Sequence, residues 1–458
     1  MRVLMLGWEF PPYISGGLGT ACLGMTKGLD EIGVDVAFVL PTAVPIAETS
    51  HVDFKTPASV KPRPRAVAAQ PAGAATETLE HVEFHRVQAA LQAYATPQSY
   101  EQAVRKLIEQ QKAVQQSGGE HSPYTEEPAA EAQPAPSMPS GTFVVGGGAH
   151  YGDDLMSQVQ RYADLAVEVA RTEPFDVIHA HDWMTFPAAA CVAAATGKPL
   201  VVHVHSTEFD RAGNNVNQQV YDIERMGMHR ADRVVCVSHL TRNLVVSRYG
   251  VPTEKVVVIY NAVQADNNGP LDLTPIKQNE KIVLFLGRVT MQKGPEYFLQ
   301  AAAKVVEKFQ DVRFVMAGSG DMITRMIRLA ADLKIGRYVT FTGFLRGGDV
   351  DRIFRMADLY VMPSVSEPFG IAPLEALSHN VPVIISKQSG VSEVLTHVLK
   401  VDFWDTDEMA NKILGVLRHE PLRKTLRQHG AIELRKFSWT DSARKLNGVY
   451  EAVCAARK

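Results

Sequence analysis

Two carboxylates occur in one segment, residues 363–376. The segment follows a predicted buried strand and begins a predicted helix. Glu367 lies in the loop, Gly370 and Ile371 at the start of the helix, and Glu375 within it. Backbone N–H groups at a helix start bind phosphate, and a glycine allows its close approach. A carboxylate accepts two hydrogen bonds from sugar or ribose hydroxyls. The segment therefore predicts a diphosphate site flanked by two sugar-binding acids. The alternative is a capping acid and an ordinary helical glutamate.

A basic turn follows the first predicted strand in the second half of the chain. It covers residues 287–294 and places Arg288 and Lys293 five residues apart. Fixed cations there would stabilise the negative charge that develops on a departing diphosphate, as a metal ion does in other enzymes. A solvated basic loop is the alternative. Because parallel strands end at a shared edge of their sheet, this turn and the segment 363–376 can face one crevice.

Polar residues also gather at two strand ends in the first half of the chain. His181 and Asp182 end one predicted strand, and His205 follows another. Strand alternation puts His179 on the same face as His181, but His181 is better placed to reach a substrate. We expect contacts to sugar hydroxyls from His181, Asp182 and His205. Histidines also bind zinc, but this spacing is not that of a zinc site and no cysteine supports one, so no metal is predicted.

A glycine-rich turn separates the first predicted strand from the first predicted helix. Gly16 and Gly17 would let the backbone approach a phosphate or a sugar. Dinucleotide sites share this location, but the spacing is not Gly-x-Gly-x-x-Gly. Although Asp35 stands about 20 residues later, dinucleotide binding is therefore not favoured.

Short β-branched runs alternate with longer segments of helical period, the pattern of parallel sheets crossed by helices. Residues 1–263 predict one α/β domain, interrupted at about 41–150 by a Pro- and Ala-rich insertion that reads as loop or disorder. Residues 264–280 predict a linker, and 281–436 a second α/β domain. The predicted fold class is α/β, with two Rossmann-like domains facing each other across a cleft.

The composition excludes several classes of protein. The 458 residues, 46% of them hydrophobic, suffice for two or three domains, and a net charge of -3 gives no overall field for nucleic acid or an anionic membrane. Four widely separated cysteines suggest neither a disulfide framework nor a zinc site, so a reducing cytoplasm is expected. The apolar start, residues 1–7, is too short for a signal peptide, and no stretch approaches the ~20 apolar residues of a membrane span. The oligomeric state is left open.

Together these motifs resemble the retaining glycosyltransferases of group 1, which have two Rossmann-like domains (the GT-B fold), and in particular the branch with glycogen and starch synthases. The resemblance covers nearly the whole chain apart from about 41–150. It rests on the order and spacing of Gly16-Gly17-Leu18, His181-Asp182-Trp183, Gly287-Arg288 with Lys293-Gly294, Ala317-Gly318-Ser319-Gly320, and Glu367-x7-Glu375. The stretches 8–12 and 205–210 favour the glycogen-synthase-like branch and make Glu9 a possible substrate contact.

The resemblance implies a role for each motif residue. His181 would lie beside the transferred sugar, while Arg288 and Lys293 bind the donor diphosphate. Glu367 would contact the donor sugar, and Glu375 would hold the ribose hydroxyls. The backbone groups implied to close around the phosphates are those of Gly16, Gly17, Gly370 and Ile371. The final helix of this fold often crosses back onto the first domain, which is expected of residues 437–458.

The implied reaction moves a hexose, with glucose as the leading choice, from a nucleotide diphosphate sugar to a glycan hydroxyl with retention of configuration. No metal or other cofactor is implied; ADP- or UDP-glucose would be the co-substrate. Ile14 stands where the bacterial ADP-glucose enzymes have a lysine, so the nucleotide is left open. Two alternatives remain. One is a transferase of another sugar or acceptor in polysaccharide assembly, and the other is a sugar-nucleotide epimerase on the same fold.

Overall fold

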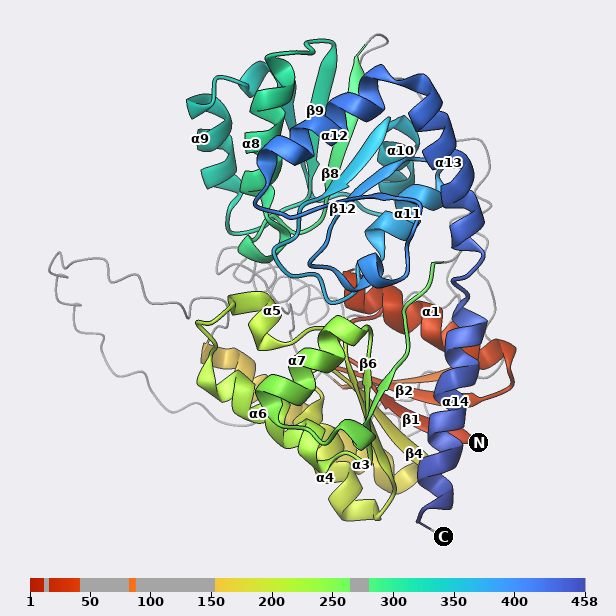
Figure 1. Ribbon diagram of the computed structural model, residues 1–458. Helices are drawn as coiled ribbons and strands as arrows, with labels where there is room; N and C mark the ends of the chain where they lie inside the picture. The colour runs from red at the N-terminus through yellow and green to blue at the C-terminus, as the bar shows by residue number, and fades with distance from the viewer. Residues whose placement is uncertain (12–15, 42–81, 88–152, 264–279, 458) are drawn as a thin grey trace, which may run out of the picture.

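Two parallel β-sheets, each flanked by helices, form the two lobes of the computed structural model (Figure 1). The structure describes residues 1–11, 16–41, 82–87, 153–263 and 280–457. The first lobe carries the N-terminal half of the chain, and the second lobe carries the C-terminal half except for the last helix. The predicted fold class, α/β with two Rossmann-like units, is confirmed.

The first lobe is built on a seven-stranded sheet. Its strands are β1 Arg2–Leu6, β2 Asp35–Pro41, β3 Val82–Val87, β4 Val177–His181, β5 Leu200–Val204, β6 Arg233–Cys236 and β7 Val256–Val258. Its helices are α1 Gly17–Glu31, α3 Asp153–Thr172, α4 Phe186–Thr196, α5 Glu208–Ala212, α6 Gln218–Arg230 and α7 His239–Tyr249. The spatial order β3-β2-β1-β4-β5-β6-β7 reverses between β1 and β4, which is where such sheets bind ligands.

The second lobe contains a six-stranded sheet in the order β10-β9-β8-β11-β12-β13. The strands are β8 Lys281–Leu286, β9 Val312–Ala317, β10 Val339–Gly343, β11 Leu359–Met362, β12 Val383–Ser386 and β13 Leu399–Val401. The helices are α8 Pro295–Val306, α9 Ile323–Asp332, α10 Gly348–Met356, α11 Ala372–Ser378, α12 Thr406–Arg418 and α13 Glu420–Leu434. Here the order reverses between β8 and β11, so the segments that follow these two strands are neighbours.

The central strands are buried on both faces because helices cover each side of the sheet. Every residue of β4 and β5 is buried. Strands in this position are normally continuous apolar runs. His179 and His181 of β4 and His203 of β5 are exceptions, fully buried despite their polar rings. They lie on the face of the sheet that α14, Trp439–Ala455, covers.

Helix α14 leaves the second lobe and lies along α1 of the first (Figure 1). Two glycines of α1 permit this approach, because a Cβ added to Gly24 or Gly28 would lie 2.1 Å or 2.5 Å from atoms of Trp439. The apolar face of α14 is buried through Leu446, Val449, Tyr450 and Val453. The chain therefore ends by tying the two lobes together through packed side chains.

Residues 82–87 correct one prediction, because they form strand β3 within the segment expected to be a loop. Strand β3 pairs in parallel with β2 from Val36↔Val82 to Pro41↔Val87 and forms the edge of the sheet. Its first four residues, Val-Glu-Phe-His, alternate apolar and polar residues, as a half-buried strand does. The remainder of the predicted insertion, up to residue 152, and residues 264–279 of the predicted linker lie outside the described residues.

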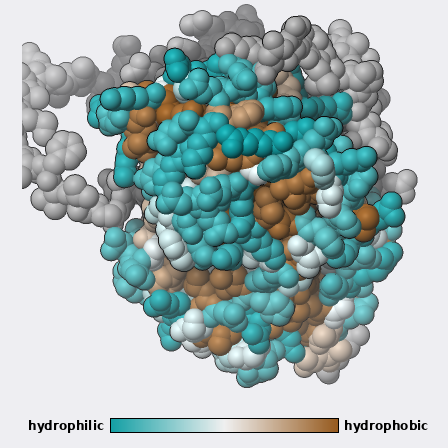
Figure 2. All heavy atoms as spheres, turned by 45° about the horizontal axis from the view of Figure 1, so that its top comes forward, coloured by the Kyte–Doolittle hydropathy of each residue, from teal (hydrophilic) through white to brown (hydrophobic). Residues whose placement is uncertain are grey.

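The face of the molecule in Figure 2 is largely hydrophilic, with hydrophobic side chains in separate patches. Across the described part of the chain, none of the helices has both the length and the apolar character needed to cross a bilayer.

Candidate active site

The basic turn and the carboxylate loop meet at the edge of the second sheet. The turn contains the 3-10 helix η3, Met291–Lys293. The Val365 N–H donates to the Gln292 carbonyl at 2.9 Å, which links the two segments. Gly294, with φ +62°, lets them approach, because a Cβ there would lie 2.3 Å from the Pro363 carbonyl oxygen. The two motifs that the sequence predicted to share a crevice are thus in direct contact.

Lys293 and Glu367 form an ion pair at this junction. Lys293 Nζ lies 2.5 Å from Glu367 Oε2, and the Ser364 hydroxyl donates to the same oxygen at 3.1 Å. The side chain of Lys293 is 23% exposed and that of Glu367 is 9% exposed, so the pair sits at the surface of the crevice with the acid beneath. A charge-assisted bond of this kind holds both side chains in defined positions.

The backbone around Glu367 is fixed by the neighbouring loop after β12. The Glu367 N–H donates to the Gln388 carbonyl at 3.0 Å, and the Gly390 N–H donates to the Glu367 carbonyl at 2.9 Å. Gly370 then turns the chain with φ +103°, a conformation that favours glycine. Ile371 caps α11, which has only seven residues. Since a short helix gives a limited dipole, Arg288 and Lys293 add positive charge that the helix start alone does not supply.

Glu375 lies in a pocket between the two lobes. It is half-buried and shares the pocket with Ile371 and His379 of the second lobe, Thr20 of α1 and Trp439 of α14. The placement puts this acid one helical turn beyond Ile371, on the side of α11 that faces the first lobe.

Glu9 approaches the same crevice from the first lobe. It is buried, and its Oε2 lies 2.8 Å from where a Cβ on Gly16 would stand, so a larger residue at position 16 would require the Glu9 carboxyl to move. Burial raises the pKa of the Glu9 carboxyl to about 7, against the lowering influence of the Arg288 charge and of a hydrogen bond from the Gly19 backbone. The Glu9 carboxyl therefore lies beside the N-terminal end of α1. Gly17, by contrast, has no described atom within 4 Å of an added Cβ.

His181 is fully buried at the end of β4 and contacts the cleft-side residue His205. Its Nδ1 lies 2.9 Å from His205 Nε2, and His205 itself is half-buried. Asp182 holds this arrangement in place, with Oδ1 accepting from the backbone N–H of His205 at 2.7 Å and of Ser206 at 3.3 Å. Asp182 has φ +58°, which an aspartate adopts more readily than most residues. Its carboxylate thus fixes the backbone of the loop after β5 by accepting these two hydrogen bonds.

Burial also raises the pKa of the Asp182 carboxyl, to about 7. The charge of Arg211 and the two backbone hydrogen bonds act in the opposite direction. The first-lobe side of the crevice therefore presents two buried acids, Glu9 and Asp182, whose protons bind more tightly than in water.

Known sequence families match successive parts of the chain. The starch synthase catalytic domain matches residues 2–122, Glycosyltransferase Family 4 matches 112–267, and Glycosyl transferases group 1 matches 273–432. An uncharacterized glycosyltransferase of Methanocaldococcus jannaschii is 31% identical over 300 residues, which are 61% of this chain and 76% of that protein. The chain belongs to the group 1 glycosyltransferases.

Solved structures agree with this family at the level of the fold. Sucrose-phosphate synthase from Thermosynechococcus elongatus has a TM-score of 0.68 and 17% identity, with 99% of each chain covered. The Anabaena protein HepE, in complex with UDP-glucose, has a TM-score of 0.64 and 17% identity, with 99% of this chain and 100% of that chain covered. The glycosyltransferase described here therefore has the GT-B fold.

Sequence patterns did not reveal a hydrogen bond that joins the two lobes of this glycosyltransferase beside the crevice. The Ser366 hydroxyl donates to Asp210 Oδ1 at 2.6 Å, next to the Lys293–Glu367 pair. Asp210 belongs to the five-residue helix α5, where Thr207 and Asp210 form a capping box. The Thr-x-x-Asp spacing was the available signal for this helix, but it says nothing about a partner 156 residues away.

A buried charge network supports α5. Arg211 donates to Glu208 at 3.1 Å and to Glu224 of α6 at 2.5 Å, and all three side chains are at most 8% exposed. The Tyr249 hydroxyl also donates to Glu224. Since each buried charge has a partner, the network fixes the position of α5 and so of Asp210 in this glycosyltransferase.

Proposed function

We propose that this protein is a retaining, metal-independent glycosyltransferase that moves a hexose from a nucleotide diphosphate sugar to a glycan hydroxyl. The leading choice of sugar is glucose, with ADP- or UDP-glucose as the donor. The observation that carries the proposal is the Lys293–Glu367 pair, 2.5 Å apart beside the turn at Gly370. The lysine can stabilise the negative charge on the departing diphosphate, and the glutamate can accept hydrogen bonds from sugar hydroxyls. Both groups lie at one edge of a parallel sheet.

Arg288 and Lys293 would bind the donor diphosphate. Both follow β8, the strand next to the topological switch point of the second sheet. Two fixed side-chain cations can balance the negative charge that develops as the diphosphate leaves. In other enzymes a bound metal ion has this role. Donor binding would then separate Lys293 from Glu367 and leave Glu367 to bind the sugar. The backbone at Gly370 and Ile371, with the Gly16–Gly17 turn opposite, would close around the phosphates.

Front-face transfer is the mechanism we favour. The bond between the anomeric carbon and the phosphate oxygen breaks, and the bond to the acceptor oxygen forms on the same face. The acceptor proton passes to the departing phosphate, so no protein nucleophile is needed. His181 would lie beside the sugar on the first-lobe side and act on it through His205, whose Nε2 lies 2.9 Å from His181 Nδ1. Asp182 and Glu9 would be further substrate-side groups. Glu375 would hold the ribose hydroxyls in the pocket between the lobes.

The acceptor proposal rests on the first lobe. The starch synthase match covers residues 2–122, which favours an α-glucan, and HepE was solved with UDP-glucose, which favours a glucose donor. Incubation of the protein with UDP- and ADP-sugars, with and without glycogen or maltooligosaccharides, tests both. We expect nucleotide release that requires a glucose donor and a glucan. NMR of the product should show an α-linkage from an α-linked donor.

Other outcomes of this assay would select the alternatives. Release that requires a different donor or acceptor would indicate another transferase of polysaccharide assembly. Conversion of the donor sugar with no acceptor present would indicate an epimerase. Lack of glucan-dependent release from every glucose donor would reject the glucan acceptor.

A further inference from the structure

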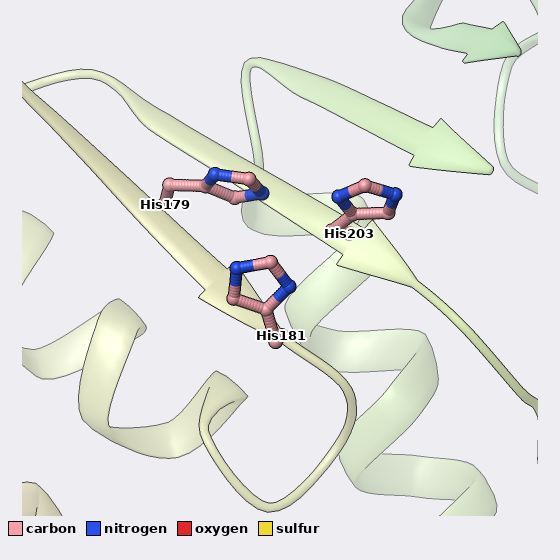
Figure 3. A group of neighbouring side chains, drawn as sticks. All are labelled: His179, His181 and His203. Carbon is pink, nitrogen blue, oxygen red and sulfur yellow. The ribbon is translucent and has the colours of Figure 1, made fainter. Parts of the chain in front are cut away.

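Three buried histidines of the first sheet share a space beneath α14. His179 and His181 lie on β4, and His203 lies opposite His181 on β5. Their ring centroids are 4.4 Å apart for His179 and His181 and 5.4 Å apart for each pair with His203. Figure 3 shows the three side chains close together on two neighbouring strands, His179 and His181 on one and His203 on the other. The register of the strands, which local sequence spacing does not reveal, creates the group.

Four of the six ring nitrogens of these histidines lack hydrogen-bond partners among the described residues. This is true of Nε2 of His179, Nε2 of His181 and both nitrogens of His203, each of which is shielded from solvent. Buried polar atoms in folded proteins nearly always have a partner, and a specific exception requires an explanation. Four such atoms in one place indicate a missing polar occupant.

We propose that His179, His181 and His203 bind a divalent transition-metal ion of the zinc class. One nitrogen from each ring already lies within 4.8 Å of the others. Zinc–nitrogen bonds of about 2.0–2.1 Å put the nitrogens of a tetrahedral site about 3.4 Å apart, so the rings rotate inward on binding. Three histidines form a known zinc ligand set that leaves the fourth position to water.

The Nδ1 atoms of His179 and His181 have the kind of hydrogen-bond partner that metal-bound histidines normally have. Nδ1 of His179 lies 2.6 Å from the Tyr450 hydroxyl, and Nδ1 of His181 lies 2.9 Å from His205 Nε2. If each Nδ1 carries the proton and donates it, each Nε2 keeps its lone pair for the metal. Burial lowers the pKa of all three rings, that of His179 to about 3, so the rings are neutral, as metal ligands must be.

The ion would hold the first sheet and the last helix together. Through Tyr450 it joins β4 and β5 to α14, the helix that ties the lobes. Arg288 and Lys293 are on the other lobe, so this role is separate from charge balance at the diphosphate. The inference concerns binding and stability and does not depend on which sugar, if any, the protein transfers.

Metal content is the direct test. Tag-free protein, purified without chelators, is exposed to Zn²⁺, dialysed and analysed by mass spectrometry, and Co²⁺ is added to chelator-stripped protein to record a tetrahedral Co²⁺ spectrum. We expect about one ion per chain and a melting temperature that rises with metal concentration. His203→Gln should lose the ion. His239→Gln, which removes an exposed histidine outside the group, should retain it.

A second variant keeps the test decisive if His203→Gln does not fold. Tyr450→Phe removes only the hydroxyl beside His179 and should weaken metal binding roughly 10- to 100-fold. Stoichiometric binding that survives unchanged in both variants would overturn the proposal. So would a folded native protein that takes up neither Zn²⁺ nor Co²⁺, since ordered water would then be the occupant.

Discussion

Lys293 Nζ and Glu367 Oε2 lie 2.5 Å apart although the two residues are 74 positions apart in the chain. The contact exists because β8 and β11 are adjacent strands, each followed directly by one of the two motifs. In the proposed reaction these groups serve the leaving diphosphate and the sugar. In the proposed donor site, the cation and the acid therefore satisfy each other's charge.

Replacement of Lys293 by alanine should abolish most turnover without unfolding the protein. Loss of one preorganised charge at a developing anion typically costs about 10²-fold or more in kcat. Lys304→Ala is a matched control, because Lys304 pairs with the exposed Asp407 in the same lobe. Steady-state assay and thermal melting of both variants provide the measurement. Equal turnover by Lys293→Ala and the native protein would refute the assignment.

Glu375→Gln should weaken nucleotide binding more than it slows the chemical step. The amide retains the size of the carboxylate but loses the charged acceptor for two ribose hydroxyls, so the Kd for UDP or ADP should rise about tenfold. Calorimetric titration with the free nucleotide measures this directly. Glu367→Gln is the contrasting variant, expected to reduce kcat while nucleotide affinity changes little. If both variants show the same pattern, the division of roles between the two acids is wrong.

Ser366→Ala should lower kcat/KM by roughly 10- to 100-fold. The hydroxyl joins the Glu367 loop to Asp210 of the first lobe at 2.6 Å, and a hydrogen bond to a charged group is worth about 1.5–3 kcal/mol. Because the bond spans the lobes, its loss should disfavour the closed arrangement that the donor requires. Thr425→Val on α13 is the control, since that exposed hydroxyl bonds to the nearby Pro421 carbonyl of the same helix.

Asp210→Asn tests the same contact from the other lobe. Its defect combined with Ser366→Ala should be smaller than the sum of the two, because Ser366→Ala removes the hydrogen bond that Asp210→Asn weakens by neutralising the acceptor. Fully additive effects would show that Ser366 and Asp210 act independently.

The arrangement of the two second-lobe motifs could be predicted from the sequence. The strands before Gly287 and Pro363 are strongly apolar, and the switch-point rule for parallel sheets makes them neighbours. The fold class and the proximity of the two motifs follow from those local patterns. The catalytic roles of Arg288, Lys293 and Glu367 remain predictions that the proposed variants test.

Contacts between distant parts of the chain could not be predicted in the same way. Tyr450 meets His179 across 271 positions because α14 crosses back, and helical periodicity identifies only its apolar face. His203 joins His179 and His181 through strand register, so the sequence spacing argued against a metal site that the packed rings suggest. Glu9 fills the space beside Gly16, a close approach that the glycine-rich sequence alone does not reveal.

Glu9→Gln should change how stability depends on pH. The Glu9 carboxyl has a pKa of about 7 in the folded protein against 4.5 as its ordinary value, with burial as the main cause. Between these values the unfolded chain loses the proton and the folded chain keeps it. Native stability therefore falls as pH rises through this window and levels off above it. A shift of this size corresponds to roughly 3 kcal/mol, which the glutamine variant should not lose.

Thermal or urea unfolding at about pH 5 and about pH 8 measures this difference, with the window set by the two pKa values. The variant should gain stability relative to the native protein as pH increases. Asp182 is present in both proteins, so its own titration cancels. Glu168→Gln on α3 controls for loss of an exposed carboxylate. Parallel pH profiles for the native protein and Glu9→Gln would mean that Glu9 is ionised in the fold, held by Arg288 and the start of α1.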